Sequence, residues 1–80
     1  MEKVKRIEVS TEGSETRLVL WIFRMDEFRM KDCPYDFKWL DNQVIFMFGG
    51  WGSNDPRPIG TAETLEEAKS LASAWLERHV

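Results

Sequence analysis

The chain has 80 residues, a net charge of −3 and 42% hydrophobic residues, including four Trp and five Phe. So many large apolar side chains exclude a disordered chain, and the length predicts a single domain spanning residues 1–80. The excess of acidic residues argues against the broad positive surface that is typical of nucleic-acid-binding domains.

The charge is unevenly placed along the chain. Residues 1–38 carry eight basic and eight acidic side chains, whereas residues 39–80 carry three basic and six acidic ones. The acidic C-terminal half favours basic protein partners, or a surface that imitates the phosphates of nucleic acid.

The longest apolar run, Leu18–Phe23, is far too short to span a membrane, and no signal peptide is visible. The single cysteine, Cys33, cannot form a disulfide within the chain. A reducing compartment is the simple inference, so we expect a cytoplasmic location. We interpret Cys33 as an ordinary thiol, with a regulatory or dimer-linking thiol as the alternative.

The N-terminal third predicts two strands joined by a turn. Val4–Ser10 alternates weakly between apolar and charged residues, which is typical of an edge strand. Gly13 marks a turn across residues 11–15, because glycine adopts the positive φ angles that turns need. The next strand, Arg17–Met25, is expected to be central in the sheet.

The strand Arg17–Met25 is the most informative segment, because it is apolar on both of its alternating faces. One face carries Leu18, Leu20 and Ile22, and the other carries Val19, Trp21, Phe23 and Met25. The chain supplies one helix, which can cover only one face of a sheet. We expect the other face to be covered by residues 26–36, folded back as a lid, or to be offered to a protein partner or a second copy.

The middle of the chain predicts a connection followed by a hairpin. Residues 26–34 are expected to form a charged connection, in which Pro34 marks a loop or an edge strand. Asp41-Asn42 fits a two-residue type I′ turn, and pairing of Leu40 with Gln43 then places six side chains on one core face. These are Tyr35, Phe37, Trp39, Val44, Phe46 and Phe48, with Tyr35 facing Phe48, Phe37 facing Phe46 and Trp39 facing Val44.

The C-terminal third predicts an irregular loop over residues 49–58, a short strand over residues 57–61 and a helix. Thr64 and Glu67 form a capping box, and apolar residues recur every three or four positions as far as His79. The whole pattern predicts an α+β fold, with an antiparallel sheet of four to five strands and one C-terminal helix packed on one face.

Residues with catalytic or metal-binding chemistry are few. The only histidine, His79, lies beside the C-terminus, where helix ends fray. Its imidazole is therefore not expected to be held in position for a relay with a nucleophile. One Cys and one His make no zinc site, and the acidic residues lack the spacing of a calcium loop. We therefore expect no enzymatic activity, no metal and no cofactor.

The glycine-rich loop, Gly49-Gly50-Trp51-Gly52, follows a strand but does not run directly into a helix, as a phosphate-binding loop would. One interpretation is a bulge or wide turn. Another is a protein-binding loop, because Trp51 and Arg57 are residue types that anchor interfaces, and prolines reduce the entropy cost of ordering the loop.

The tail G-T-A-E-T-L-E-E-A-K-S-L-A-S-A-W-L-E resembles the strand-turn-helix endings of many small bacterial and phage proteins, in which Thr-Leu-Glu-Glu-Ala-Lys caps the last helix. The compact, acidic, aromatic-rich chain also resembles in type the anti-CRISPR inhibitors carried by phages and mobile elements. This resemblance implies stoichiometric binding to a host defence complex in the host cytoplasm, which blocks a nucleic-acid channel or a subunit contact.

The leading expectation is a non-enzymatic small binding protein, an inhibitor or adaptor that acts through protein contacts and without a membrane. The expected partner-binding residues are Trp21, Phe23, Met25, Trp51, Asp55 and Arg57. Two alternatives stay open: a small nucleic-acid-binding module that uses the sheet aromatics, and a self-associating structural domain that forms a homodimer.

Overall fold

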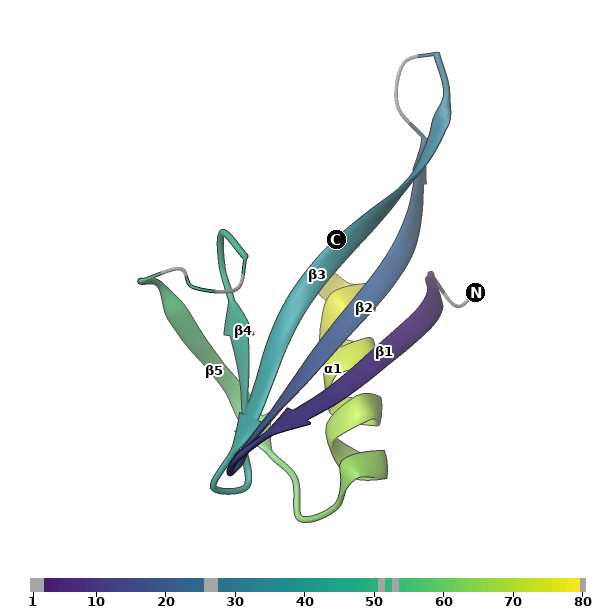
Figure 1. Cartoon of the computed structure of the whole chain (residues 1–80). Helices are drawn as coiled ribbons and strands as arrows, with labels where there is room; N and C mark the ends of the chain where they lie inside the picture. The colour runs from purple at the N-terminus through teal and green to yellow at the C-terminus, as the bar shows by residue number, and fades with distance from the viewer. Residues whose placement is uncertain (1–2, 26–27, 51, 53, 80) are drawn as a thin grey trace.

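The computed structural model describes residues 3–25, 28–50, 52 and 54–79. They form a five-stranded antiparallel sheet with one C-terminal helix behind it, which confirms the predicted α+β fold (Figure 1). The elements are β1 (Val4–Glu12), β2 (Glu15–Met25), β3 (Met30–Leu40), β4 (Gln43–Met47), β5 (Pro56–Thr61) and α1 (Leu65–His79). Strands adjacent in sequence are adjacent in the sheet, in the order β1-β2-β3-β4-β5.

The strand pairing decides which face of β2 is core. Leu18 pairs with Phe37 and Leu20 with Tyr35, so these four side chains share the face beneath α1. Leu18 and Leu20 are fully buried, together with residues of β3, β4 and the helix. The other buried core residues are Ile22, Phe37, Val44, Phe46, Ala62, Ala68, Ala72 and Leu76. The opposite face of β2 carries Val19, Trp21 and Phe23.

The predicted β3–β4 hairpin is present. Asp41 and Asn42 have φ angles of 50° and 64°, as a type I′ turn requires. Leu40 pairs with Gln43, and the Trp39–Val44 and Phe37–Phe46 pairs follow as predicted. The hairpin therefore places the core side chains of β3 and β4 under the helix.

Phe48 is not a core residue, which corrects the prediction that it faces Tyr35. The recorded pairing of β3 with β4 ends at Phe37 and Phe46, β4 ends at Met47, and Phe48 is 48% exposed. Gly49 and Gly50 have φ angles of 92° and 97°, and the N–H of Gly50 donates to the Met47 carbonyl oxygen at 3.0 Å. The chain turns away here, before it can pair with Tyr35.

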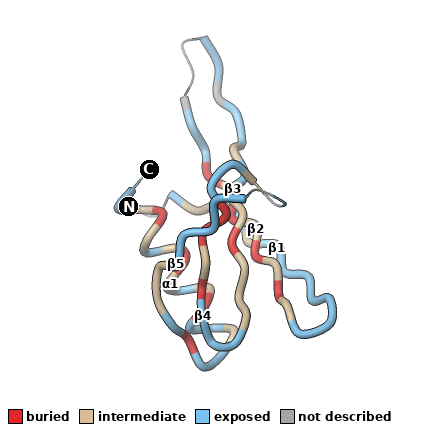
Figure 2. The backbone as a smooth tube through the Cα atoms, turned by 90° about the vertical axis from the view of Figure 1, so that its left-hand side faces the viewer, coloured by how far each residue is buried: buried red, intermediate tan, exposed pale blue. Residues whose placement is uncertain are grey.

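Residues 30–36 form the first part of β3, so the predictions of a charged connection and of a lid are both wrong. β3 pairs with β2 from Met30 opposite Met25 to Trp39 opposite Thr16. The ends of these two strands project past the helix as a narrow arm, exposed along most of its described length (Figures 1 and 2). Pro34 lies outside the part of β3 that pairs with β4. One side of β3 is therefore an open edge at this position, and edge strands tolerate proline.

The predicted helix cap is also present, with one difference. The N–H of Glu67 donates to Thr64 Oγ1 at 3.2 Å, as in a capping box. The carboxylate of Glu67 accepts from the N–H of Glu63 at 3.0 Å, one residue earlier than in the usual pattern. The cap fixes the point at which the chain leaves the sheet and begins α1.

α1 packs closely against β5 at Gly60, where an added Cβ would lie 2.7 Å from Leu71 Cδ2. We expect Gly60→Val to lower the free energy of unfolding by about 1–3 kcal/mol, because the new side chain overpacks this contact. Urea denaturation of the purified variant measures the effect.

Thr61→Val is the matched control, because Thr61 is the exposed neighbour on the same strand. This control should change the free energy of unfolding by less than about 0.5 kcal/mol. Adding Leu71→Ala to Gly60→Val should recover part of the loss if the two side chains collide. A double variant no more stable than Gly60→Val would contradict this explanation.

Candidate functional site

The sheet face opposite α1, called here the open face, has an aromatic and aliphatic centre on β2. Trp21 lies between Arg6 and Pro34, and Val19 lies between Glu8 and Asp36. Figure 1 views this face directly, with α1 on the far side of the sheet. The helix therefore does not cover the open face.

Two cations of β1 lie over the aromatic rings of β2. The Arg6 guanidinium carbon lies 4.7 Å from the Trp21 ring centroid, and Lys5 Nζ lies 5.2 Å from that of Phe23. The register shifts between Val4 and Arg6, so consecutive residues of β1 reach neighbouring aromatic residues of β2. Phe23 is 41% exposed, whereas Trp21 is half-buried.

Ion pairs cross the strands beside this aromatic centre. Arg17 donates from Nε and Nη2 to Asp36 Oδ1, at 3.0 and 2.7 Å, and the Asp36 side chain is only 13% exposed. Lys38 Nζ lies 3.4 Å from Glu15 Oε1. The open face thus combines an apolar centre with polar side chains of both signs around it.

The arm carries a second set of exposed side chains. Phe28, between the two strands, is 94% exposed. Arg24 and Lys31 pair across the two strands on the helix side of the arm, where Arg24 Nη1 also donates to the Tyr35 hydroxyl at 3.2 Å. Met25, a predicted site residue, ends β2, and its side chain lies outside the described part of the structure.

The described members of the predicted set lie on two separate surfaces. Trp21 and Phe23 lie on the open face, whereas Arg57 pairs with Phe46 and so belongs to the helix side of the sheet. Arg57 Nη2 lies 3.0 Å from Asp55 Oδ2, so these two residues form an ion pair. Trp51 lies outside the described residues. The alternation of side chains along each strand separates the two groups.

A groove lies where β3 and β4 part, and sequence reasoning missed it because Phe48 was assigned to the core. The groove, called here the aromatic groove, has a volume of about 370 Å³. Its lining includes Tyr35, Asp36, Phe46, Phe48, Gly49 and Gly50. The Gly-Gly pair directly after Phe48 is the sequence signal that could have revealed it, since a turn there draws Phe48 away from β3.

His79 is held in place, contrary to the expectation of a frayed end. Its ring stacks on Trp75 with centroids 4.4 Å apart, and Nδ1 lies 2.9 Å from the Trp75 carbonyl oxygen. Among the described residues, no three His, Cys, Asp or Glu side chains gather as a metal site would require. Cys33 is a half-buried free thiol packed against the core.

No family model, curated protein or solved structure matches this chain. Within the described residues, no helix combines the length and the apolar character needed to cross a membrane.

Proposed function

We propose that this chain is a non-enzymatic binding protein, which contacts a protein partner through the open face and the arm. The observation that carries the proposal is the exposure of Phe23 and Phe28 on these surfaces, together with the half-buried Trp21. Phe23 is 41% and Phe28 94% exposed, and Trp21 lies on the same face of β2 as Phe23. Burying large aromatic side chains contributes strongly to binding, and tryptophan is among the residues most often found to dominate it.

The surroundings of Trp21 suit an interface. Within the described part of the molecule, its indole N–H is buried without a hydrogen-bond acceptor. A buried N–H group without an acceptor lowers the stability of the free protein. If Arg6 moved aside, an acceptor from a partner could bond to this N–H and offset that cost. The charged pairs around this centre would form the polar rim that protein interfaces have around an apolar core.

The edges of the sheet favour binding by a face over binding by strand addition. β1 is irregular at Lys5, β5 contains Pro56 and Pro58, and Pro34 lies on the open part of β3. Bulges and prolines at edge strands oppose pairing with another chain. A homodimer formed by extending the sheet is therefore disfavoured relative to contact through the open face.

We propose further that the partner is a host defence complex in the cytoplasm of the host cell, and that this chain inhibits it by binding. The molecule measures 41 × 27 × 20 Å along its principal axes, and the arm projects from one end of it (Figure 1). A narrow arm with aromatic side chains is suited to enter a channel or a subunit contact in a larger complex. One copy bound there would block the partner without chemistry.

Capture from host lysate on the immobilised protein tests the proposal, with bound proteins quantified by mass spectrometry. We expect Phe23→Ala to lower capture of a specific protein, and the Trp21→Ala, Phe23→Ala double variant to lower it at least about tenfold. The reason is that the variants remove the aromatic centre of the open face.

Val9→Ala is the matched control, because Val9 is 38% exposed but pairs with Leu18 on the helix side of the sheet. Circular dichroism checks that each variant is folded. Equal capture by the wild type, the control and the double variant would contradict the assignment of the open face.

A further inference from the structure

We infer that the open face binds a carboxylate at Trp21, which an acidic side chain of the protein partner supplies. This inference rests on the function proposed above and adds the chemistry of the partner at the same surface. Three observations converge on the side of Trp21 that faces β1. They are an indole N–H without an acceptor, two cations over the aromatic rings, and a bulge that brings both cations to one face.

The indole N–H of Trp21 is a donor that the fold leaves unused. Within the described part of the molecule, Trp21 Nε1 is buried and has no acceptor. The same group of Trp39 donates to the carbonyl oxygen of Ala62 at 3.0 Å, so the fold does satisfy another half-buried indole. Buried donors are rarely left without a partner in native proteins, and each exception calls for an explanation. An acceptor supplied by a binding partner explains this one.

A bulge in β1 brings two consecutive cations to the aromatic centre. The register shifts just before Arg6, which pairs with Trp21, and Lys5 is an extra residue of β1 without a pairing partner on β2. Consecutive residues of a regular strand point to opposite faces, whereas a bulge can re-aim one of them. Lys5 Nζ thereby reaches the ring of Phe23, at 5.2 Å from its centroid, while the Arg6 guanidinium lies over Trp21. Both cations therefore belong to the open face.

The cation over Trp21 is available to a partner. Arg6 Nη2 lies 3.1 Å from Glu8 Oε1, but both side chains are more than half exposed, and exposed ion pairs contribute little to stability. The bond between Arg17 and Asp36 is different, because the Asp36 side chain is only 13% exposed and accepts two donors. A carboxylate from a partner can therefore replace Glu8 at Arg6 at little cost, whereas Arg17 stays with Asp36.

A carboxylate fits these groups better than a neutral acceptor does. A carbonyl oxygen would accept from the indole N–H but would leave the cations without a counter-charge. A carboxylate has two oxygens, so one can accept from Trp21 Nε1 and the other from Arg6 once the guanidinium has moved off the ring. Apolar side chains next to the acid would pack on Phe23, which is 41% exposed. The partner segment is thus acidic at one position and apolar around it.

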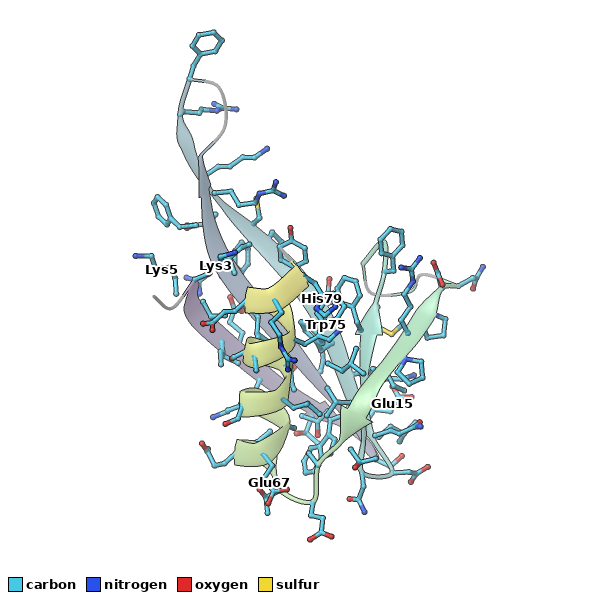
Figure 3. The ribbon with its side chains drawn as sticks, turned by 180° about the vertical axis from the view of Figure 1, so that it is seen from behind. Lys3, Lys5, Glu15, Glu67, Trp75 and His79 are labelled. Atoms are coloured by element: carbon cyan, nitrogen blue, oxygen red, sulfur yellow. The ribbon has the colours of Figure 1, made fainter. Side chains whose placement is uncertain are left out.

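The placement of charge decides on which side of the open face the acid binds. Asp32 lies opposite Phe23 on β3, so a carboxylate is repelled from that side of the aromatic centre and attracted to the β1 side. Figure 3 places Glu15 and Glu67 at the end of the molecule away from the arm, whereas Lys5 lies nearer to the arm. The net negative charge of the chain therefore does not oppose an acidic partner at this position.

Titration of the isotope-labelled protein with capped pentapeptides tests the inference, with the indole N–H signals followed by NMR. The probe is the peptide Ser-Leu-Asp-Phe-Ser, and its counterparts carry Asn or Lys in place of Asp. The Trp21 signal, identified by its loss in Trp21→Phe, should move downfield with the Asp peptide because the N–H gains an acceptor. The Asp peptide should bind at least about fivefold more tightly than the Asn peptide, since charge-assisted hydrogen bonds are the stronger ones.

Two variants and one matched control locate the carboxylate. Arg6→Gln and Trp21→Phe should each reduce the preference for the Asp peptide to about twofold or less, because each removes one donor. Lys38→Gln removes the same charge from the open face, but Lys38 contacts Glu15 farther along the sheet, so this control should keep the preference. An unmoved Trp21 signal, equal affinity for the Asp and Asn peptides, or an equal loss of preference in Lys38→Gln would each overturn the inference.

The inference and the proposed function fail separately. If the Trp21→Ala, Phe23→Ala variant loses protein capture but the Asp and Asn peptides bind equally well, the open face is the interface and the acidic contact is wrong. If the Asp peptide binds as expected but the same variant captures as much protein as the wild type, the carboxylate site is supported and the proposed function of the open face is wrong.

Discussion

Replacing Phe37 by alanine is expected to lower the free energy of unfolding by about 3–5 kcal/mol. Phe37 is fully buried, and its ring lies 5.2 Å from that of Phe46 and meets that of Trp75 edge-on at 5.9 Å. It joins the sheet to the helix, and truncation leaves a cavity between them. A domain of this size has a total stability of about 4–12 kcal/mol, so much of it would be lost.

Urea denaturation monitored by tryptophan fluorescence measures this loss. Phe23→Ala is the matched control, since it removes the same ring from a position that is 41% exposed on the open face. It should cost less than about 1 kcal/mol, mainly through the lost contact with Lys5. Similar losses in the two variants would mean that Phe37 does not hold the core together.

The second large effect is expected for Leu76→Ala, at about 2–5 kcal/mol. Leu76 is fully buried where the last turns of α1 lie against the sheet, and α1 supplies the cover for the core face of β2. The near-ultraviolet circular dichroism of Trp75, the preceding residue, should weaken, and the urea midpoint should fall. The expected result is a sheet whose core face is partly opened to water.

Ser70→Ala is the control for this prediction, because Ser70 is exposed on the same helix. It should change the free energy of unfolding by less than about 0.5 kcal/mol. If Leu76→Ala behaves like Ser70→Ala, α1 contributes little to stability, and the assignment of the core to one face of the sheet is wrong.

The open face and the aromatic groove give the molecule two surfaces of different chemistry. The open face places cations over Trp21 and Phe23 and surrounds them with charges of both signs. The groove places Arg57 against Phe48 and opens at the base of the arm.

Features that depend on neighbouring residues were predictable from the amino acids alone. The capping box at Thr64, the three- and four-residue spacing up to His79 and the Asp41-Asn42 turn each specify local backbone geometry. The hairpin register followed from that turn, because a two-residue loop determines which residues pair. The ion pair of Asp55 and Arg57 is also a local feature, because it joins residues two positions apart in the sequence.

Features that depend on distant pairing were decided only by the tertiary structure. Both faces of β2 are apolar, so its pattern could not say which of them lies under α1, and the pairing of Leu18 with Phe37 decides it. Pro34 was expected in a loop or at an edge strand, and it lies in edge-strand backbone because β4 leaves that side of β3 open. The turn at Gly49 and Gly50 removes Phe48 from the core and creates the groove. The first two outcomes depend on where other strands begin and end, which no local pattern of side chains encodes. The third had a local signal in the Gly-Gly pair after Phe48.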